Sequence, residues 1–383
     1  MALYMSSNPL EGILGKFSGL FKSSGGGSAI GIDIGASAIK IVQIKKERGR
    51  AILETYGSLS LGPYAEGQVG QVVPIAEEQL VAALGDLLKE SNTTTKNSAL
   101  SIPASASLVF LMELPPRVSE KDLTSIIQTE ARKYIPVPIT EVSLDWWVIP
   151  KRPEDGMTDD SPKPTKEDVD QEPTKVLVAA IHNDTLNKYQ SLVTDSKLQT
   201  DFFEIEMFSN LRAVIGQDLS NIMIVDIGAS KTKISIVDRG VIQDFHIVNK
   251  GSQDLTIALS TGLQVPFAEA EEMKKRFGLG DNPKYPTAKE ITKSTLDYIF
   301  FEINNVVLSY EKKYNKSIGK VILTGGGVLL NGFMDLAPSK FNTEVSLGNP
   351  FSKIESPAFL ENVLAESGPE FGVAAGLALR KLN

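Results

Sequence analysis

The sequence predicts an α/β fold made of two related lobes, with a small subdomain inserted into the first. An apolar strand in residues 29–46 runs into Asp-Ile-Gly-Ala-Ser and returns as a second strand, and residues 222–240 repeat this design with the same five residues. Because the two copies lie far apart in the chain, they indicate a duplicated lobe rather than a solenoid. The length of 383 residues is also sufficient for two or three hydrophobic cores.

Composition and charge argue against several classes of protein. The net charge of −8 and the pI of about 5.1 argue against general nucleic-acid binding, which needs a basic surface. Without cysteine the chain cannot form disulfides or thiolate metal sites, and with two histidines a structural zinc site is not expected. No apolar run reaches the roughly 18–20 residues that span a bilayer, and the N-terminus lacks the pattern of a secretory signal.

Residues 1–27 are expected to form an amphipathic and flexible N-terminal segment. Asn8 and Pro9 suit the start of a helix, and apolar residues then recur on one helical face as far as Phe21, with Lys16 and Lys22 beside it. This pattern is typical of a helix that lies on the inner leaflet of a membrane or on a partner. The alternatives are a helix packed on its own domain or an unstructured tail, since three glycines weaken the helix.

The segments between the two repeats have distinct patterns. Residues 77–90 predict a helix with leucines on one face. Residues 98–149 predict a strand–helix–strand packet, in which Ser119 caps the helix. Residues 150–174 alternate proline with acidic residues and predict a mobile loop, since they cannot bury enough apolar surface to become ordered. Residues 175–181 are strand-like again, so the loop joins two strands of one domain.

The repeated turns have the composition of a phosphate-binding site. Small residues let backbone N–H groups approach phosphate oxygens, and hydroxyl side chains add further donors. The predicted contacts are Gly35, Ala36 and Ser37 in the first turn, and Gly228, Ala229, Ser230 and Thr232 in the second. Either turn alone is equally well explained as an ordinary β-turn, whereas the two copies together favour a binding site.

Charged residues beside the turns extend this prediction. Asp33 and Asp226 end the incoming strands, where they would face Mg²⁺ through its water ligands, since Mg²⁺ prefers a few carboxylates with water and phosphate. Lys40 lies on the returning strand, where its ammonium group can reach a phosphate. The candidates to position an attacking water are Asp33, Glu206 and Asp226.

Two later motifs would contact the rest of the ligand. A strand in residues 321–332 runs into Gly325, Gly326 and Gly327, whose bare backbone would lie along a purine or a ribose. Residues 268–278 predict a charged helix in which Glu271 and Lys274 lie three residues apart. The alternatives are an ordinary glycine turn and a solvated helix face.

The order of these motifs resembles that of the superfamily of actin, heat-shock chaperones and sugar kinases. By this resemblance residues 33–40 and 226–233 are the two phosphate motifs, residues 324–327 are the adenosine motif, and Glu271 with Lys274 contacts ribose and adenine. The resemblance implies an actin-like (RNase H-like) duplicated two-lobe ATPase fold that binds ATP and Mg²⁺. It also implies connecting helices at residues 203–216 and 370–382, with Glu206 near the attacking water.

Within this superfamily the chain is similar to the PilM family of type IV pilus assembly proteins and to its relative FtsA. The similarity spans residues 28–383 and is carried by IPASASLVFLMELP, EARKYIPVPITEVSLDWW, FEIEMFSNLRAV and AEEMKKRFGL. The chain departs from the family in its long acidic loop and its longer N-terminus. The implied subdomains are 1A at 28–97 and 175–220, an inserted 1C-type subdomain at 98–174, 2A at 221–250 and 319–383, and 2B at 251–318.

PilM proteins bind ATP between the lobes and the cytoplasmic N-terminal peptide of the inner-membrane protein PilN beside subdomain 1C. The resemblance therefore implies a cytoplasmic scaffold at the inner face of the membrane, within the type IV pilus assembly platform, that binds ATP rather than turning it over rapidly. Self-association and contacts with other platform proteins are open. An apolar peptide groove is expected among Ile102, Leu108, Phe110, Ile126, Ile127 and Tyr134.

Two other functions remain as alternatives. One is an FtsA-like membrane-tethered filament of cell division, although FtsA usually carries an amphipathic C-terminal helix, which residues 380–383 do not provide. The other is a small-molecule kinase of the same fold, which would need a base for a substrate hydroxyl and larger substrate-binding insertions.

Overall fold

The computed structural model describes residues 27–116, 118–150, 173–216 and 220–382. Contacts divide the chain into two compact units, a larger one from residues 23–103 and 191–383 and a smaller one that includes residues 104–190. The predicted N-terminal helix at residues 7–22 and most of the predicted acidic loop lie outside the described residues.

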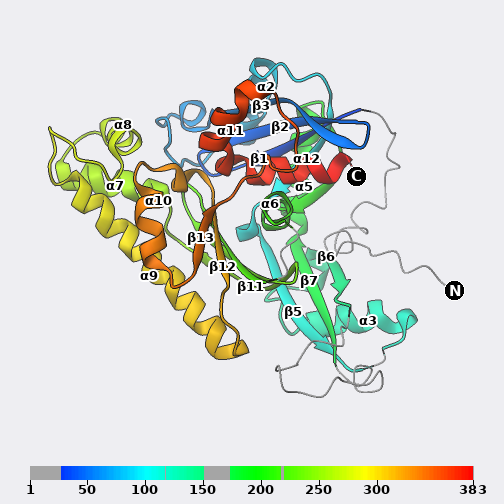
Figure 1. Ribbon diagram of the computed structural model, residues 1–383. Helices are drawn as coiled ribbons and strands as arrows, with labels where there is room; N and C mark the ends of the chain where they lie inside the picture. The colour runs from blue at the N-terminus through cyan, green and yellow to red at the C-terminus, as the bar shows by residue number, and fades with distance from the viewer. Residues whose placement is uncertain (1–26, 117, 151–172, 217–219, 383) are drawn as a thin grey trace. The chain divides into compact units, whose positions relative to one another are not determined.

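The larger unit contains two five-stranded sheets with the same topology (Figure 1). In each sheet three antiparallel strands are followed by two strands that run parallel to the first strand of the hairpin. The first sheet has the order β3-β2-β1-β4-β8, with β1 Ser28–Ile34, β2 Ala38–Glu47, β3 Arg50–Ser60, β4 Asn97–Ile102 and β8 Gln199–Ile205. The second has the order β11-β10-β9-β12-β13, with β9 Asn221–Ile227, β10 Thr232–Asp238, β11 Val241–Val248, β12 Lys320–Thr324 and β13 Glu344–Leu347. The predicted duplication is therefore confirmed.

The two repeated hairpins share one register. Asp33 lies opposite Lys40 in the first hairpin, and Asp226 lies opposite Lys233 in the second. Each turn is closed by the N–H of its glycine, which donates to the carbonyl three residues on at 3.0 Å. Because the turn sets the register of a hairpin, identical turn residues produce identical pairings in both lobes.

Helices and short 3₁₀ helices connect and cover the sheets of the larger unit. The predicted helix at residues 77–90 is confirmed, and three of its leucines are buried. The helices are α2 Glu77–Glu90, α6 Glu206–Val214, α7 Ser252–Leu263, α8 Phe267–Phe277, α9 Ala288–Tyr314, α10 Phe333–Leu336, α11 Glu361–Ser367 and α12 Gly372–Leu382. The 3₁₀ helices are η1 Gly62–Ala65, η4 Gly326–Leu329, η5 Ala337–Lys340, η6 Ala358–Leu360 and η7 Gly368–Phe371. Among the described residues, no helix is both long and apolar enough to cross a membrane.

Helix α12 packs on β1 and on α6, and glycines permit both contacts. A Cβ atom on Gly376 would lie 1.8 Å from the carbonyl oxygen of Ser209, and one on Gly31 would lie 1.9 Å from that of Ala374. We therefore group α2, α6 and α12 with the first sheet as the first lobe, and α7, α8 and α9 with the second sheet as the second lobe. The subdomain bounds expected from the sequence, 2A at 221–250 and 319–383, place α12 with the second lobe instead.

Both connecting helices begin later than the sequence predicted. Residues 203–205 belong to β8, where they pair with β4, and α6 begins at Glu206. The second helix is preceded by η7, and α12 begins at Gly372. A short apolar stretch is compatible with a strand or a helix, and here the neighbouring strand decides the outcome.

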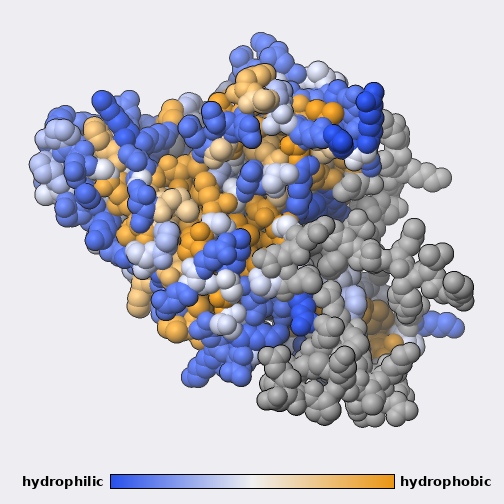
Figure 2. Space-filling view, viewed as in Figure 1, coloured by the Kyte–Doolittle hydropathy of each residue, from blue (hydrophilic) through white to orange (hydrophobic). Residues whose placement is uncertain are grey.

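Helix α9 has apolar residues on two sides. Phe300 and Ile303 lie in the core of the second lobe, whereas Tyr298, Phe301 and Leu308 are exposed. On the face shown in Figure 2, apolar side chains gather over α9, α10 and β13.

The smaller unit contains a three-stranded antiparallel sheet of order β5-β7-β6. Its elements are β5 Ser107–Leu114, α3 Glu120–Ala131, β6 Val142–Val148, β7 Thr174–His182 and the beginning of α5 Asn183–Asp195, with the 3₁₀ helices η2 Ala104–Ala106 and η3 Ile139–Glu141. The predicted cap is confirmed, since the Ser119 hydroxyl accepts a hydrogen bond from the Asp122 N–H. Helix α3 packs on the sheet through Ile127, which is fully buried.

The bounds of the inserted packet differ from the predicted residues 98–174. Strand β4 belongs to the first sheet of the larger unit, between β1 and β8, whereas β7 is the central strand of the smaller sheet. Both strands are largely buried, and local sequence alone does not determine which sheet a buried strand joins.

Candidate functional site

The larger unit contains a cavity of about 420 Å³. Both repeated hairpins, strand β3, helix α8 and the segment after β12 contribute to its wall. Of the predicted contacts, it brings together Ser37, Lys40, Gly228, Ala229, Glu271, Lys274, Gly326 and Gly327. The other lining residues are Ala38, Ser58, Ser60, Val69, Gly70, Ser252, Leu255, Lys275, Leu329, Leu330 and Glu370.

The predicted contacts Gly35, Ala36, Ser230, Thr232 and Gly325 are not among the lining residues. Thr232 is fully buried, and its hydroxyl donates to the carbonyl of Lys250 at 2.9 Å, so it stabilises the lobe instead of facing the cavity. Gly325 has a φ of +88°, and a Cβ atom there would lie 2.3 Å from Oδ1 of Asp226. Its role in the structure is to let the end of β12 pass close to Asp226.

Lys40 lines the cavity, and its ammonium lies 3.8 Å from the carboxylate of Glu370 in η7. Four lining residues, Glu370, Ser58, Ser60 and Gly70, belong to no motif that the sequence predicts. Ser58 lies opposite Lys40 on the next strand, so the pairing of these two strands could have predicted it. Gly70 donates its N–H to the Ser60 hydroxyl at 3.2 Å, a contact between a loop and a strand end that no local motif predicts.

Glu271 and Lys274 form a buried pair on α8. Their charged groups lie 2.7 Å apart, and the Thr256 hydroxyl donates to Glu271 at 2.6 Å. Burial opposes the charge of Glu271, but Lys274 and Thr256 outweigh it and hold the pKa of Glu271 below its usual value. Burial also lowers the pKa of Lys274. Because both side chains are buried in the cavity wall, the alternative of a solvated helix face does not hold.

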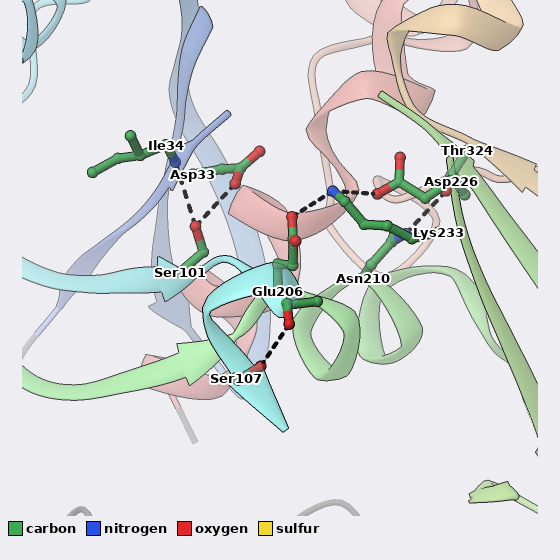
Figure 3. Close-up of polar contacts among 10 residues, drawn as sticks. Asp33, Ile34, Ser101, Ser107, Glu206, Asn210, Asp226, Lys233 and Thr324 are labelled. Carbon is green, nitrogen blue, oxygen red and sulfur yellow. Dashed lines mark hydrogen bonds and ion pairs between the residues drawn. The ribbon is translucent and has the colours of Figure 1, made fainter. Parts of the chain in front are cut away.

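The three predicted acids, Asp33, Glu206 and Asp226, are not among the lining residues of this cavity. Figure 3 shows the ammonium of Lys233 between Glu206 and Asp226, at 2.6 and 3.3 Å from their carboxylates. Asp33 accepts a hydrogen bond of 2.9 Å from the hydroxyl of Ser101 (Figure 3).

The pKa values of the acids and of Lys233 shift for different reasons. Burial raises the pKa of Asp33 and of Glu206, and the nearby lysines only partly offset it. Burial would lower the pKa of Lys233, but Asp226 and Glu206 outweigh it and raise that pKa above its usual value. The two carboxylates therefore favour the charged form of Lys233.

The cavity fits a phosphate-bearing ligand of nucleotide size. Its volume lies within the usual range for small-molecule sites. It combines a cation, Lys40, with the bare backbone of Gly326, where a Cβ atom would meet nothing closer than Glu370 at 3.9 Å. Among the residues that the structure describes, no group of three or more acids and histidines is arranged to hold a metal directly.

Comparison with solved structures identifies the fold. The chain resembles a structure of a PilM–PilN type IV pilus biogenesis complex, with a TM-score of 0.75 and 22% identity over 93% of this chain and 98% of the other. It also resembles the ethanolamine utilization protein EutJ from Carboxydothermus hydrogenoformans, with a TM-score of 0.53 and 15% identity over 97% and 99%. The predicted actin-like two-lobe fold is therefore confirmed.

Comparison of sequences relates the chain to FtsA and to PilM. It is 24% identical to cell division protein FtsA of Neisseria meningitidis over 46% of this chain and 48% of that protein, and 25% identical to FtsA of Helicobacter pylori over 54% and 47%. The chain thus spans about half the length of the curated relatives it matches. The family model of the type IV pilus assembly protein PilM matches residues 31–382, nearly the whole chain. The chain therefore belongs to the PilM family of type IV pilus assembly proteins.

Proposed function

We propose that this chain binds ATP with Mg²⁺ in the cavity of its larger unit. The observation that carries the proposal is that both hairpins, the Glu271–Lys274 pair and the glycine segment reach one cavity from distant parts of the chain. Lys40 and the turn residues Ser37, Gly228 and Ala229 would hold the phosphates. Glu271 and Lys274 would hold the ribose and base, with the backbone of Gly326 and Gly327 alongside.

Mg²⁺ would be held through water by Asp33 and Asp226, and it would neutralise phosphate charge. Glu206 is the candidate to position an attacking water, but its carboxylate is engaged by Lys233 at 2.6 Å. An attacking water would have to compete with the Lys233 ammonium for this carboxylate. We therefore propose nucleotide binding without rapid hydrolysis.

Gly326→Leu tests the nucleotide site. Because a Cβ atom at this position meets nothing closer than Glu370 at 3.9 Å, the leucine side chain projects into the cavity without straining the fold. The dissociation constant for Mg-ATP should rise about 10- to 100-fold, since overpacking costs ~1–3 kcal/mol. Isothermal titration calorimetry measures it.

Gly85→Leu is the matched control, because a Cβ atom on Gly85 of α2 meets nothing within 4 Å and lies outside the cavity lining. It should leave the affinity for Mg-ATP unchanged. Equal affinities in wild type and Gly326→Leu would place the nucleotide elsewhere.

We further propose that the chain is a scaffold of the type IV pilus assembly platform, at the inner face of the cytoplasmic membrane. Membership in the PilM family and the likeness to a PilM–PilN complex support this role. The proposed partner is the cytoplasmic N-terminal peptide of a PilN-like inner-membrane protein.

The smaller unit offers aromatic surface for such a peptide. Tyr134 is 48% exposed and stacks on Phe110, with ring centroids 4.7 Å apart. Leu108 and Ile126 are partly buried, as an apolar groove requires. Of the six residues predicted for the groove, Ile127 lies in the core of this unit and Ile102 is buried in the larger unit, so neither can contact a peptide.

Tyr134→Ser should weaken binding of a PilN-type N-terminal peptide about tenfold or more, because an exposed aromatic anchor contributes ~2 kcal/mol to an interface. Fluorescence anisotropy with and without Mg-ATP measures this. Tyr298→Ser is the control, since Tyr298 is 49% exposed on α9 of the larger unit. Wild-type protein that fails to bind the peptide in either condition contradicts the scaffold role. Filaments seen by electron microscopy would then favour the FtsA-like alternative.

A further inference from the structure

The two repeated hairpins carry lysines at equivalent positions, yet the two side chains have different surroundings. Lys40 and Lys233 each lie opposite the aspartate of their own hairpin. Lys40 lines the cavity and lies near Glu370. Lys233 is absent from the cavity lining and contacts two carboxylates instead. Of the two duplicated lysines, one therefore lines the cavity and the other pairs with carboxylates of the protein.

The contacts of Lys233 join the two lobes. Glu206 begins α6 of the first lobe, whereas Asp226 is the second-last residue of β9 in the second. All three side chains are at most 20% exposed. Figure 3 shows the ammonium between the two carboxylates, so its charge is shared by both. Without a cation between them, these two largely buried carboxylates would repel each other.

We propose that Lys233 is a built-in cation that holds Glu206 and Asp226 together across the lobes, so that the nucleotide-free protein needs no divalent metal at this place. The inference rests on the proposed nucleotide site in one point. Mg²⁺ that binds with ATP would interact with Asp226, the same carboxylate that pairs with Lys233. Lys233 is thus a positioning residue, and it distinguishes the second hairpin from the first.

Lys233→Met removes the charge and keeps the length of the side chain. In EDTA and without nucleotide, its melting temperature should fall by roughly 5–10 °C, because breaking a buried ion pair leaves a carboxylate uncompensated. Mg²⁺ alone, added as MgCl₂, should restore most of this loss, since the metal can take the place of the ammonium. The wild-type melting temperature should not change with MgCl₂. Differential scanning calorimetry measures all four conditions.

Two further variants separate charge from packing. Lys40→Met makes the same substitution at the equivalent position and should weaken ATP binding without creating a response of the melting temperature to MgCl₂. In the double variant Lys233→Met with Glu206→Gln, one excess negative charge is removed, so the melting temperature in EDTA should rise towards the wild-type value. The double variant also serves as the test if Lys233→Met alone does not fold.

The proposal is overturned if neither MgCl₂ nor Glu206→Gln raises the melting temperature of Lys233→Met, because the loss then reflects packing alone. It is also overturned if wild type responds to MgCl₂ as strongly as the variant. If wild-type protein does not bind ATP in calorimetry, the proposed nucleotide site is wrong, whereas the proposal about Lys233 is unaffected. The metal experiment needs no nucleotide, so the two failures are distinguishable.

Discussion

Glu204→Gln is expected to destabilise the larger unit by about 3–5 kcal/mol, the usual cost of removing one partner from a buried ion pair. Glu204 is fully buried in β8. It accepts two hydrogen bonds of 2.6 Å from Arg212 of α6 and one of 3.0 Å from Arg380 of α12, and a further bond from Ser209. The amide cannot compensate two guanidinium groups, so the contact between β8, α6 and α12 is weakened. Urea denaturation followed by circular dichroism measures the loss.

Glu355→Gln is the control for this variant. Glu355 pairs with Arg50 at 2.8 Å, but the two side chains are 51% and 71% exposed. Exposed pairs contribute about 0–1 kcal/mol, so this variant should have nearly wild-type stability. Equal stabilities of Glu204→Gln and Glu355→Gln would mean that the buried cluster does not stabilise the fold.

The effect of Glu204→Gln should depend on pH. Burial alone would raise the pKa of Glu204, but Arg212, Arg380 and Ser209 outweigh it and hold the pKa below the ordinary value of 4.5. A carboxyl group with a lower pKa in the folded state stabilises the fold above its unfolded pKa and loses that contribution as the pH falls through its folded pKa. The difference between wild type and variant should therefore be full at pH 7 and shrink below about pH 4.5.

Gly376→Ala is expected to destabilise the protein by about 1–3 kcal/mol or more, since overpacking of a close contact has this cost. The added Cβ atom would lie 1.8 Å from the carbonyl oxygen of Ser209 and 2.9 Å from its Cα atom. These are backbone atoms, so no side-chain rotation relieves the clash and α12 must move away from α6. Thermal and urea unfolding followed by circular dichroism measure the change.

The same substitution at Gly85 should have the opposite sign. A Cβ atom on Gly85 of α2 meets nothing within 4 Å. Alanine in a helix interior is favoured over glycine by about 0.8–1 kcal/mol, so Gly85→Ala should stabilise the protein. A stability of Gly376→Ala equal to or above wild type would contradict the close packing of α6 and α12.

Local patterns predicted much of the fold and part of the site. The paired DIGAS segments predicted two equivalent sheets, because turn and register depend on neighbouring residues. The leucine spacing of α2 and the cap at Ser119 were confirmed for the same reason. The contact of Glu271 with Lys274 follows from their separation by three residues on one helix.

Contacts between distant segments escaped prediction. Glu370 and Gly70 join the cavity from parts of the chain without a motif, and the sheets that β4 and β7 join depend on long-range pairing. Lys40 and Lys233 are indistinguishable by local pattern, since each follows its aspartate by seven residues.

The sequence by itself therefore determined the duplicated sheets, their hairpin registers and the resemblance to the PilM family, because these depend on residues close together in the chain. Only the tertiary structure decided that Lys40 faces the cavity while Lys233 joins Glu206 to Asp226. The physical reason is that a lysine side chain is long and flexible, so the carboxylates that the folding of the larger unit brings near it decide where its ammonium lies.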